Sequence, residues 1–179
     1  TAQPCPAGDA VIAQLKQGRP GEAIPTLEGA TLALEGVLAF TKKRYLARAM
    51  LALAMAQAEA RQPRAALETM VALMTWRPKL IYDSATFDPQ HMALMERAKA
   101  IVKRKRRGSA ELKTDPPGAK AYVDGRFMGV TPTVVFGLKA GDHYATFKRT
   151  GFVKAARKIT VSGRRQLSYS ATMKRSEKY

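Results

Sequence analysis

The pattern of apolar residues changes near Gly108, and this change constrains the fold more than any other feature of the chain. From Asp9 to about Arg106, apolar residues recur every three or four positions among strong helix formers, which is typical of amphipathic helices. After Gly108, short segments rich in Val, Tyr, Phe and Thr alternate with Gly- and Pro-containing turns, which is typical of strands. We therefore predict an α+β chain of two domains, an α-helical domain of about five helices at 1–107 and an all-β domain at 108–179.

Two helices of the first domain are predicted to form an antiparallel hairpin. Apolar residues form a stripe over 43–61, and its many alanines allow close approach of a neighbouring helix. A second stripe follows Pro63, which suits a first-turn position because proline has no amide to donate, and it ends before the Arg-Pro dipeptide at 77–78. The last helix is expected to use Asp88 as its N-cap and Pro89 as its first residue.

The first domain also contains an internal repeat. Pro, Ala, Ile and Leu at positions 20, 23, 24 and 27 are matched, in order, by Pro, Ala, Leu and Met at positions 63, 66, 67 and 70. The stretch Gly-Arg-Pro-Gly-Glu-Ala at 18–23 resembles the turn and second-helix start of a tetratricopeptide (TPR) repeat. This resemblance implies a TPR-like helical domain.

The second domain reads as short paired strands. A hairpin is predicted at 121–128, because Asp124-Gly125 tolerates the positive φ that a two-residue turn requires. Further strands are expected near 110–114, 133–136, 143–148, 155–161 and 166–173. About seven strands of this length predict a small β-sandwich.

Turn signals spaced along the second half carry a family resemblance. They are Pro116-Pro117-Gly118-Ala119, Tyr122-Val123-Asp124-Gly125, Gly129, Thr131-Pro132, Ala140-Gly141-Asp142-His143 and Lys148-Arg149-Thr150-Gly151-Phe152. In this order they closely resemble the PEGA domain, with Pro117 in place of the motif's Glu and Phe152 in place of the usual Tyr. The resemblance implies a non-catalytic, β-sandwich-like module of bacterial and archaeal envelope and surface proteins, often attached to TPR arrays. It also implies a structural role for the turn residues Pro116, Pro117, Gly118, Asp124, Gly125, Gly129, Thr131, Pro132, Gly141 and Gly151.

Composition and charge limit the classes of function. Hydrophobic residues make up 46% of the 179 residues, which is enough to build a buried core. The longest apolar run, 49–56, is much shorter than the ~20 residues of a membrane-spanning helix. The single cysteine, Cys5, excludes an internal disulfide and a cysteine-based zinc cluster. The net charge of +17 favours an anionic partner.

No residue pattern indicates catalysis, a metal or a cofactor. His91 and His143 have no Cys or carboxylate cluster at metal-ligand spacing, and we expect His143 to be a half-exposed structural residue at the start of a strand. Motifs of serine hydrolases, dinucleotide- or phosphate-binding proteins and zinc proteases are absent from the sequence. Asp124 is better explained by its turn than by acid–base chemistry. We predict a protein that is not an enzyme and that uses no cofactor or metal.

The sharpest local feature is a run of five cations, Lys103, Arg104, Lys105, Arg106 and Arg107, after the last predicted helix. One interpretation is structural, because cations at a helix C-terminus stabilise the dipole by about 0.3–1 kcal/mol and keep a linker soluble. The other is functional: an anion clamp at the domain junction that contacts phosphate, uronate or an acidic protein face. Both halves of the chain carry net positive charge, so charge does not single out one of them.

These observations lead to an expected function of docking. The chain starts Thr-Ala-Gln without Met, which we interpret as a mature end after signal removal, and we expect a periplasmic or envelope location. The expected role is a non-enzymatic scaffold or subunit that binds other envelope proteins. The alternative is a binder of an anionic polymer or membrane surface through the basic residues. Nucleic acid is disfavoured, because single strands are bound largely by aromatic side chains that stack on the bases. The aromatic residues of the second domain are expected by default to lie in the core or partly in it; they are Tyr122, Phe127, Phe136, Tyr144, Phe147, Phe152 and Tyr169.

Overall fold

A computed structural model describes residues 18–79 and 88–177, and it confirms the α+β organisation at the level of helices followed by strands. The helices of the described part are α2 (Pro20–Gly36), α3 (Lys43–Glu59), α4 (Pro63–Trp76) and α5 (Pro89–Arg104). The remaining helix of the predicted five, near the start of the chain, lies outside the described residues, as does Cys5. Within the described part, no helix combines the length and apolar character needed to span a membrane.

Proline marks the starts of three of these helices. Pro20, Pro63 and Pro89 each occupy the first turn, where a missing amide costs no helical hydrogen bond. At α5 the Asp88 carboxylate accepts a hydrogen bond of 2.8 Å from the backbone amide of His91, which is the N-cap interaction expected from the sequence. Local sequence therefore fixes where these helices begin.

The helices pack around α3 and α4, which lie antiparallel in a hairpin. Ala54 of α3 and Ala66 of α4 are fully buried and offer little bulk, so these two helices pack closely. The largest buried cluster joins α3, α4 and α5 through Leu46, Met50, Met70, Leu73, Met74, Trp76, Met95, Ala98 and Val102. A smaller cluster from Ala23, Ile24, Leu27, Leu53 and Ala56 attaches α2 to α3.

The second part consists of short strands in two sheets. The strands are β1 (Arg107–Asp115), β2 (Lys120–Val123), β3 (Arg126–Val130), β4 (Thr133–Lys139), β5 (Gly141–Lys148), β6 (Ala155–Val161) and β7 (Leu167–Thr172). One sheet has the order β4-β1-β7 and the other has the order β3-β2-β5-β6. All pairings are antiparallel except that of β1 with β7. Residues of both sheets share one apolar cluster that includes Leu112, Val123, Val135, Phe147 and Ile159.

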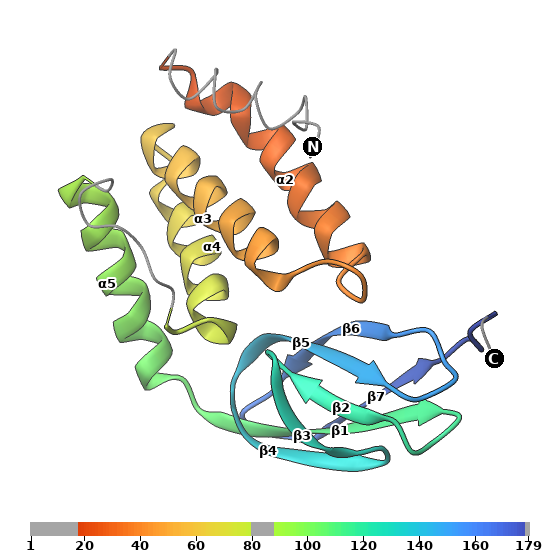
Figure 1. The fold of residues 1–179 in the computed structure, drawn as a ribbon. Helices are drawn as coiled ribbons and strands as arrows, with labels where there is room; N and C mark the ends of the chain where they lie inside the picture. The colour runs from red at the N-terminus through yellow and green to blue at the C-terminus, as the bar shows by residue number, and fades with distance from the viewer. Residues whose placement is uncertain (1–17, 80–87, 178–179) are drawn as a thin grey trace.

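The helices and the strands are joined through β5. Tyr144 is 1% exposed and lies in the helical cluster, with its ring edge-on to Trp76 at 5.0 Å between centroids. Its hydroxyl donates a 2.5 Å hydrogen bond to Glu35 Oε1, and Lys158 Nζ lies 3.0 Å from the same oxygen. Lys43 Nζ donates to the Tyr144 carbonyl at 2.9 Å. The ends of α2, α3 and α4 therefore meet the side of the β part that carries β5 and β6 (Figure 1).

Candidate functional site

The predicted cluster of cations spans a tight passage from helix to strand. Lys103 and Arg104 form the last turn of α5, Lys105 is the C-cap, and Arg107 already begins β1. Lys105 Nζ donates to Thr75 Oγ1 at 3.1 Å, and Arg107 Nη1 donates to the Gly137 carbonyl at 2.6 Å. Burial lowers the pKa of Lys105, against the attraction of Asp142. Lys105 and Arg107 therefore help to stabilise the connection between α5 and β1.

A lysine from β4 completes this passage. Lys139 Nζ donates to the carbonyls of Lys103 at 2.8 Å and Lys105 at 3.1 Å. Carbonyls at the C-terminus of a helix lack intrahelical partners, so this ammonium satisfies them and anchors α5 on the β part. The spacing in the sequence gave no sign of this contact.

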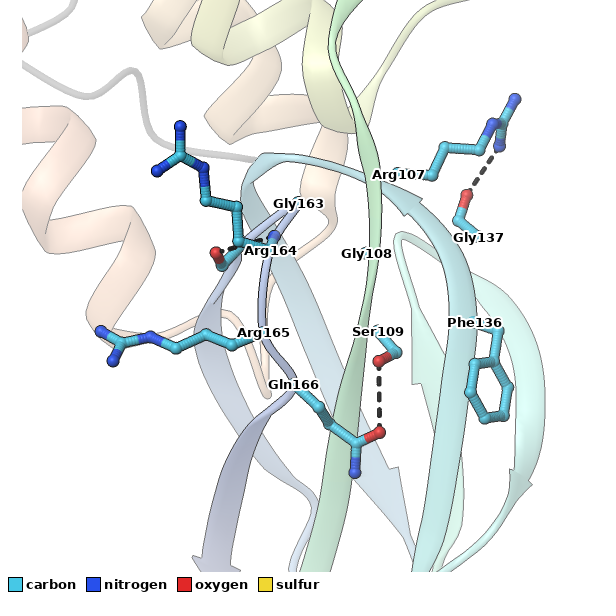
Figure 2. Close-up of a pocket in the computed structure, with 10 residues that line it drawn as sticks. Arg107, Gly108, Ser109, Phe136, Gly137, Gly163, Arg164, Arg165 and Gln166 are labelled. Atoms are coloured by element: carbon cyan, nitrogen blue, oxygen red, sulfur yellow. Dashed lines mark hydrogen bonds between the residues drawn. The ribbon is translucent and has the colours of Figure 1, made fainter.

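A pocket of about 340 Å³ lies beside the start of β1 (Figure 2). Arg164 and Arg165, from the loop between β6 and β7, line it together with Arg107 and Phe136. Figure 2 shows Arg107 on one side of β1, bonded to Gly137, and the two loop arginines on the other side. Arg107 and the two loop arginines thus lie on opposite sides of β1, and the sequence pattern gave no sign that Arg164 and Arg165 line this pocket.

Gly108 allows the close packing beside this pocket. A Cβ on Gly108 would lie 2.0 Å from the carbonyl oxygen of Ser162. A Cβ on Gly163 would lie 2.6 Å from Cβ of Arg106. The absence of side chains at both positions lets the β6–β7 loop lie against the first residues of the strand.

The turn residues named from the sequence occupy the connections and strand ends of the β part. Four connections contain such residues: β1–β2 (Pro116, Pro117, Gly118), β2–β3 (Asp124, Gly125), β3–β4 (Thr131, Pro132) and β5–β6 (Gly151). The other two lie in strands, Gly129 within β3 and Gly141 at the start of β5. Asp124 (φ 52°) and Gly125 (φ 89°) both have positive φ, as a two-residue hairpin turn requires. The Thr131 hydroxyl is buried, 2.5 Å from the Thr114 hydroxyl and 3.0 Å from the amide of Ala119, which donates to it.

Asp124 also makes contacts that its turn does not explain. Its Oδ2 lies 2.6 Å from Nδ1 of His143, and its Oδ1 accepts from the amide of Tyr144 at 3.0 Å. The His143 side chain is 3% exposed, so the expectation that it is half-exposed is wrong; Asp124 and the Lys139 carbonyl, 2.7 Å from Nε2, pair both ring nitrogens. Burial lowers the pKa of His143, but the hydrogen bond and charge of Asp124 outweigh it, so the pKa is raised above its ordinary value.

The second histidine lies at the start of α5. His91 is 3% exposed, and its ring nitrogens lie 3.2 Å from Asp88 Oδ1 and 3.6 Å from Glu59 Oε1. In the described ranges, no group of three or more His, Cys, Asp or Glu side chains is placed to hold a metal ion.

A groove crosses the helices. Its volume is about 460 Å³, and we call it the helical groove. It is lined by Glu28, Thr31, Leu32 and Glu35 of α2, Met50 and Leu53 of α3, Glu68, Thr69 and Ala72 of α4, and Lys158 of β6. Leu32 is 69% exposed at the groove, so an apolar floor opens to solvent between three glutamates.

Comparison with known families identifies the β part. The model of the PEGA domain family matches residues 107–177, so the chain contains a PEGA domain that covers all seven strands. This confirms the resemblance drawn from the turn signals. No curated protein matches the sequence.

Proposed function

We propose that the protein is a non-enzymatic scaffold or adaptor of the bacterial cell envelope, located in the periplasm, that docks other envelope proteins into a larger assembly. In this proposal the helical part is TPR-like and offers one docking surface. The PEGA domain is a β-sandwich and offers the other. Tandem surfaces gain avidity through effective concentration, so neither contact has to be strong alone.

The helical groove is the observation that carries the proposal. It combines an exposed leucine and buried apolar side chains with a rim of Glu28, Glu35 and Glu68. Acidic side chains are the minority in a chain of net charge +17, so three of them around one apolar groove distinguish it from the rest of the basic surface. Grooves of this kind receive the apolar face of an amphipathic helix or an extended segment.

Charge complementarity defines the occupant. A partner segment with apolar residues for the floor and lysine or arginine for the rim fits the helical groove best. Glu28 is exposed at the rim, whereas Glu35 already bonds Tyr144 and Lys158, so we assign Glu28 the larger share of the charge contacts.

The paired helix starts support the TPR-like part of the proposal. The repeated prolines both begin helices, at Pro20 and Pro63, and the alanines three residues later, Ala23 and Ala66, are both fully buried. The repeat in sequence thus corresponds to a repeat in packing. The joint at Tyr144 would hold the two docking surfaces at a fixed separation.

Site-specific photo-crosslinking in intact native cells tests the proposal. A photoreactive residue at Leu32 should capture one envelope protein through a segment that is both apolar and basic, and the same residue at exposed Arg97 on α5 should not. With the purified partner, Leu32→Asp and Glu28→Lys should each weaken binding about tenfold, while Arg97→Gln changes it little. Equal capture at both positions would contradict the docking role, and so would an affinity for the partner that neither Leu32→Asp nor Glu28→Lys changes.

The basic residues favour a second candidate function, binding of an anionic polymer. Lys103, Arg104 and Arg106 are exposed, and Arg106 lies against Gly163 of the pocket that Arg164 and Arg165 line. Neutralising Lys103, Arg104 and Arg106 together should remove retention on an acidic polysaccharide or lipid if they form the clamp. Unchanged retention at equal salt would reject it.

A further inference from the structure

A second basic surface lies on the outer face of the β3-β2-β5-β6 sheet. Two recesses of about 640 and 260 Å³ share Tyr122, Lys148 and Lys154 and so form one elongated depression, which we call the basic trough. Lys120 and Arg149 line one end of it, and Lys43 at the start of α3 lines the other. The trough therefore runs from the β5–β6 loop across the sheet to the helical part.

Two lysines of the trough lie close enough to repel each other. Lys120 of β2 and Lys148 of β5 are direct cross-strand partners on the outer face of the sheet. Like charges in this arrangement repel, because opposite residues on neighbouring strands have Cβ atoms only about 5 Å apart. Among the described residues that line the trough, none is Asp or Glu, so the repulsion is not relieved locally. Such an uncompensated group of cations is a site for an anion.

Lys43 brings a further charge to the inner end. Its ammonium donates to the Tyr144 carbonyl at 2.9 Å, which holds it at the border between helices and sheet. Burial lowers the pKa of Lys43, Asp124 acts in the opposite direction, and the repulsion of Lys148 lowers it further. An anion in the trough would relieve this repulsion.

The lining chemistry selects the kind of anion. The polar side chains of the trough are lysine, arginine, threonine and tyrosine, and none of its described lining residues is Asn, Gln, Asp or Glu. A ligand rich in oxygen acceptors is satisfied by such a lining, whereas the amides of an acidic peptide would find few side-chain acceptors. This favours a polymer of carboxylates, ether oxygens and hydroxyls.

The aromatic rings of the trough disfavour nucleic acid. Lys148 Nζ lies 4.7 Å from the centroid of the Tyr122 ring, and Phe127 packs edge-on against that ring at 5.6 Å. Arg149 covers Phe152, with Cζ 4.9 Å from the ring centroid. Rings covered in this way have less free face for stacking bases, and stacking is a main source of affinity for single strands.

We infer that the basic trough binds a linear acidic polysaccharide, with uronate-type carboxylates against Lys120, Lys148 and Lys154 and with sugar hydroxyls along the threonines. The inference does not depend on docking at the helical groove, which lies on other residues. It assigns the PEGA domain a carbohydrate surface separate from the run of cations at Lys103–Arg107.

Binding of polygalacturonate to the whole protein, measured by titration calorimetry over a series of salt concentrations, tests the inference. The variant Lys120→Gln/Lys148→Gln/Lys154→Gln should bind about ten- to hundredfold more weakly, because each exposed ion pair contributes modestly and three are removed. The matched variant Lys103→Gln/Arg104→Gln/Arg106→Gln removes the same charge from the run of cations. It should bind within about twofold of the wild type if the trough is the site, and it should lose binding if the clamp of the second candidate function is the site. Neutral dextran should not bind, and thermal unfolding should show that both variants are folded.

Several results would overturn the inference. Equal weakening by both variants would show a general charge effect, and selective weakening by the matched variant would place the anion at the run of cations. Tighter binding of polyglutamate or of a single-stranded oligonucleotide than of polygalacturonate would assign the trough to a peptide or to nucleic acid. None of these outcomes bears on the Leu32 and Glu28 variants, so docking and carbohydrate binding can fail separately.

Discussion

The joint at Tyr144 makes a quantitative prediction about how the two parts unfold. Tyr144→Phe removes only the hydroxyl that donates to Glu35 at 2.5 Å, while the carboxylate keeps Lys158 at 3.0 Å. Tyr144→Ala also removes a ring that is 1% exposed and that packs edge-on against Trp76. The two variants therefore separate the hydrogen bond from the packing.

The expected losses differ by the contribution of the ring. A hydrogen bond to a charged group contributes about 1.5–3 kcal/mol, so Tyr144→Phe should lower the free energy of unfolding by about 2 kcal/mol. Truncation of a buried aromatic side chain costs about 3–5 kcal/mol, so Tyr144→Ala should lose about 5 kcal/mol with the hydrogen bond included. The second value approaches the whole stability of many domains, which is about 5–15 kcal/mol.

Urea unfolding followed by two probes measures the effect. Fluorescence of Trp76, the one tryptophan of the chain, reports the joint, and far-UV circular dichroism reports helices and strands together. The two transitions should coincide in the wild type and separate in Tyr144→Ala. Tyr122→Phe, whose ring lies in the trough, serves as the control and should change stability by less than about 0.5 kcal/mol. A Tyr144→Phe variant that unfolds at the wild-type urea midpoint would refute the reasoning.

Four further predictions concern the β part and α2. The pKa of His143 is raised in the folded protein, so its contribution to stability is full below its unfolded pKa of about 6.5 and is lost as pH rises through the folded pKa. The urea midpoint of the wild type should therefore fall as pH rises through this range, and the midpoint of His143→Gln should depend less on pH. Lys120→Thr removes the repulsion with Lys148 and should stabilise the protein by about 0.2–1 kcal/mol in urea unfolding, and a loss would contradict the like-charge argument. Gly108→Ala places a Cβ 2.0 Å from the Ser162 carbonyl and should cost roughly 1–3 kcal/mol. Gly21→Ala in α2, where nothing lies within 4 Å, should instead raise the thermal midpoint, consistent with a gain of about 0.5–1 kcal/mol.

Local patterns explain how much of the fold could be predicted from the sequence. Helix starts at Pro63 and Pro89 and the turn at Asp124-Gly125 depend on backbone chemistry within a few residues. The turn signals of the second half depend on the same kind of chemistry, and their order was enough to indicate the PEGA domain.

Long-range contacts explain what could not be predicted. His143, Tyr144 and Ala145 are consecutive and all buried, because β5 is covered by the apolar core on one face and by the helices on the other. A strand alone gives no sign of such a second cover. The rings of Phe127 and Phe136 are exposed, so their expected core positions are wrong; alternation along a strand does not by itself show which face meets the core. The candidate sites depend on pairing in space: Lys120 meets Lys148 only through the register of β2 and β5.

The parallel pairing of β1 with β7 has a mechanical consequence. The chain enters the PEGA domain at the first residue of β1, beside α5, and leaves it from the far end of β7, next to Asp115 (Figure 1). A pulling force applied between these two points would slide the strands along one another and load all six paired positions at once, instead of opening them one by one. Tension between these two points would therefore load the β1–β7 hydrogen bonds in shear.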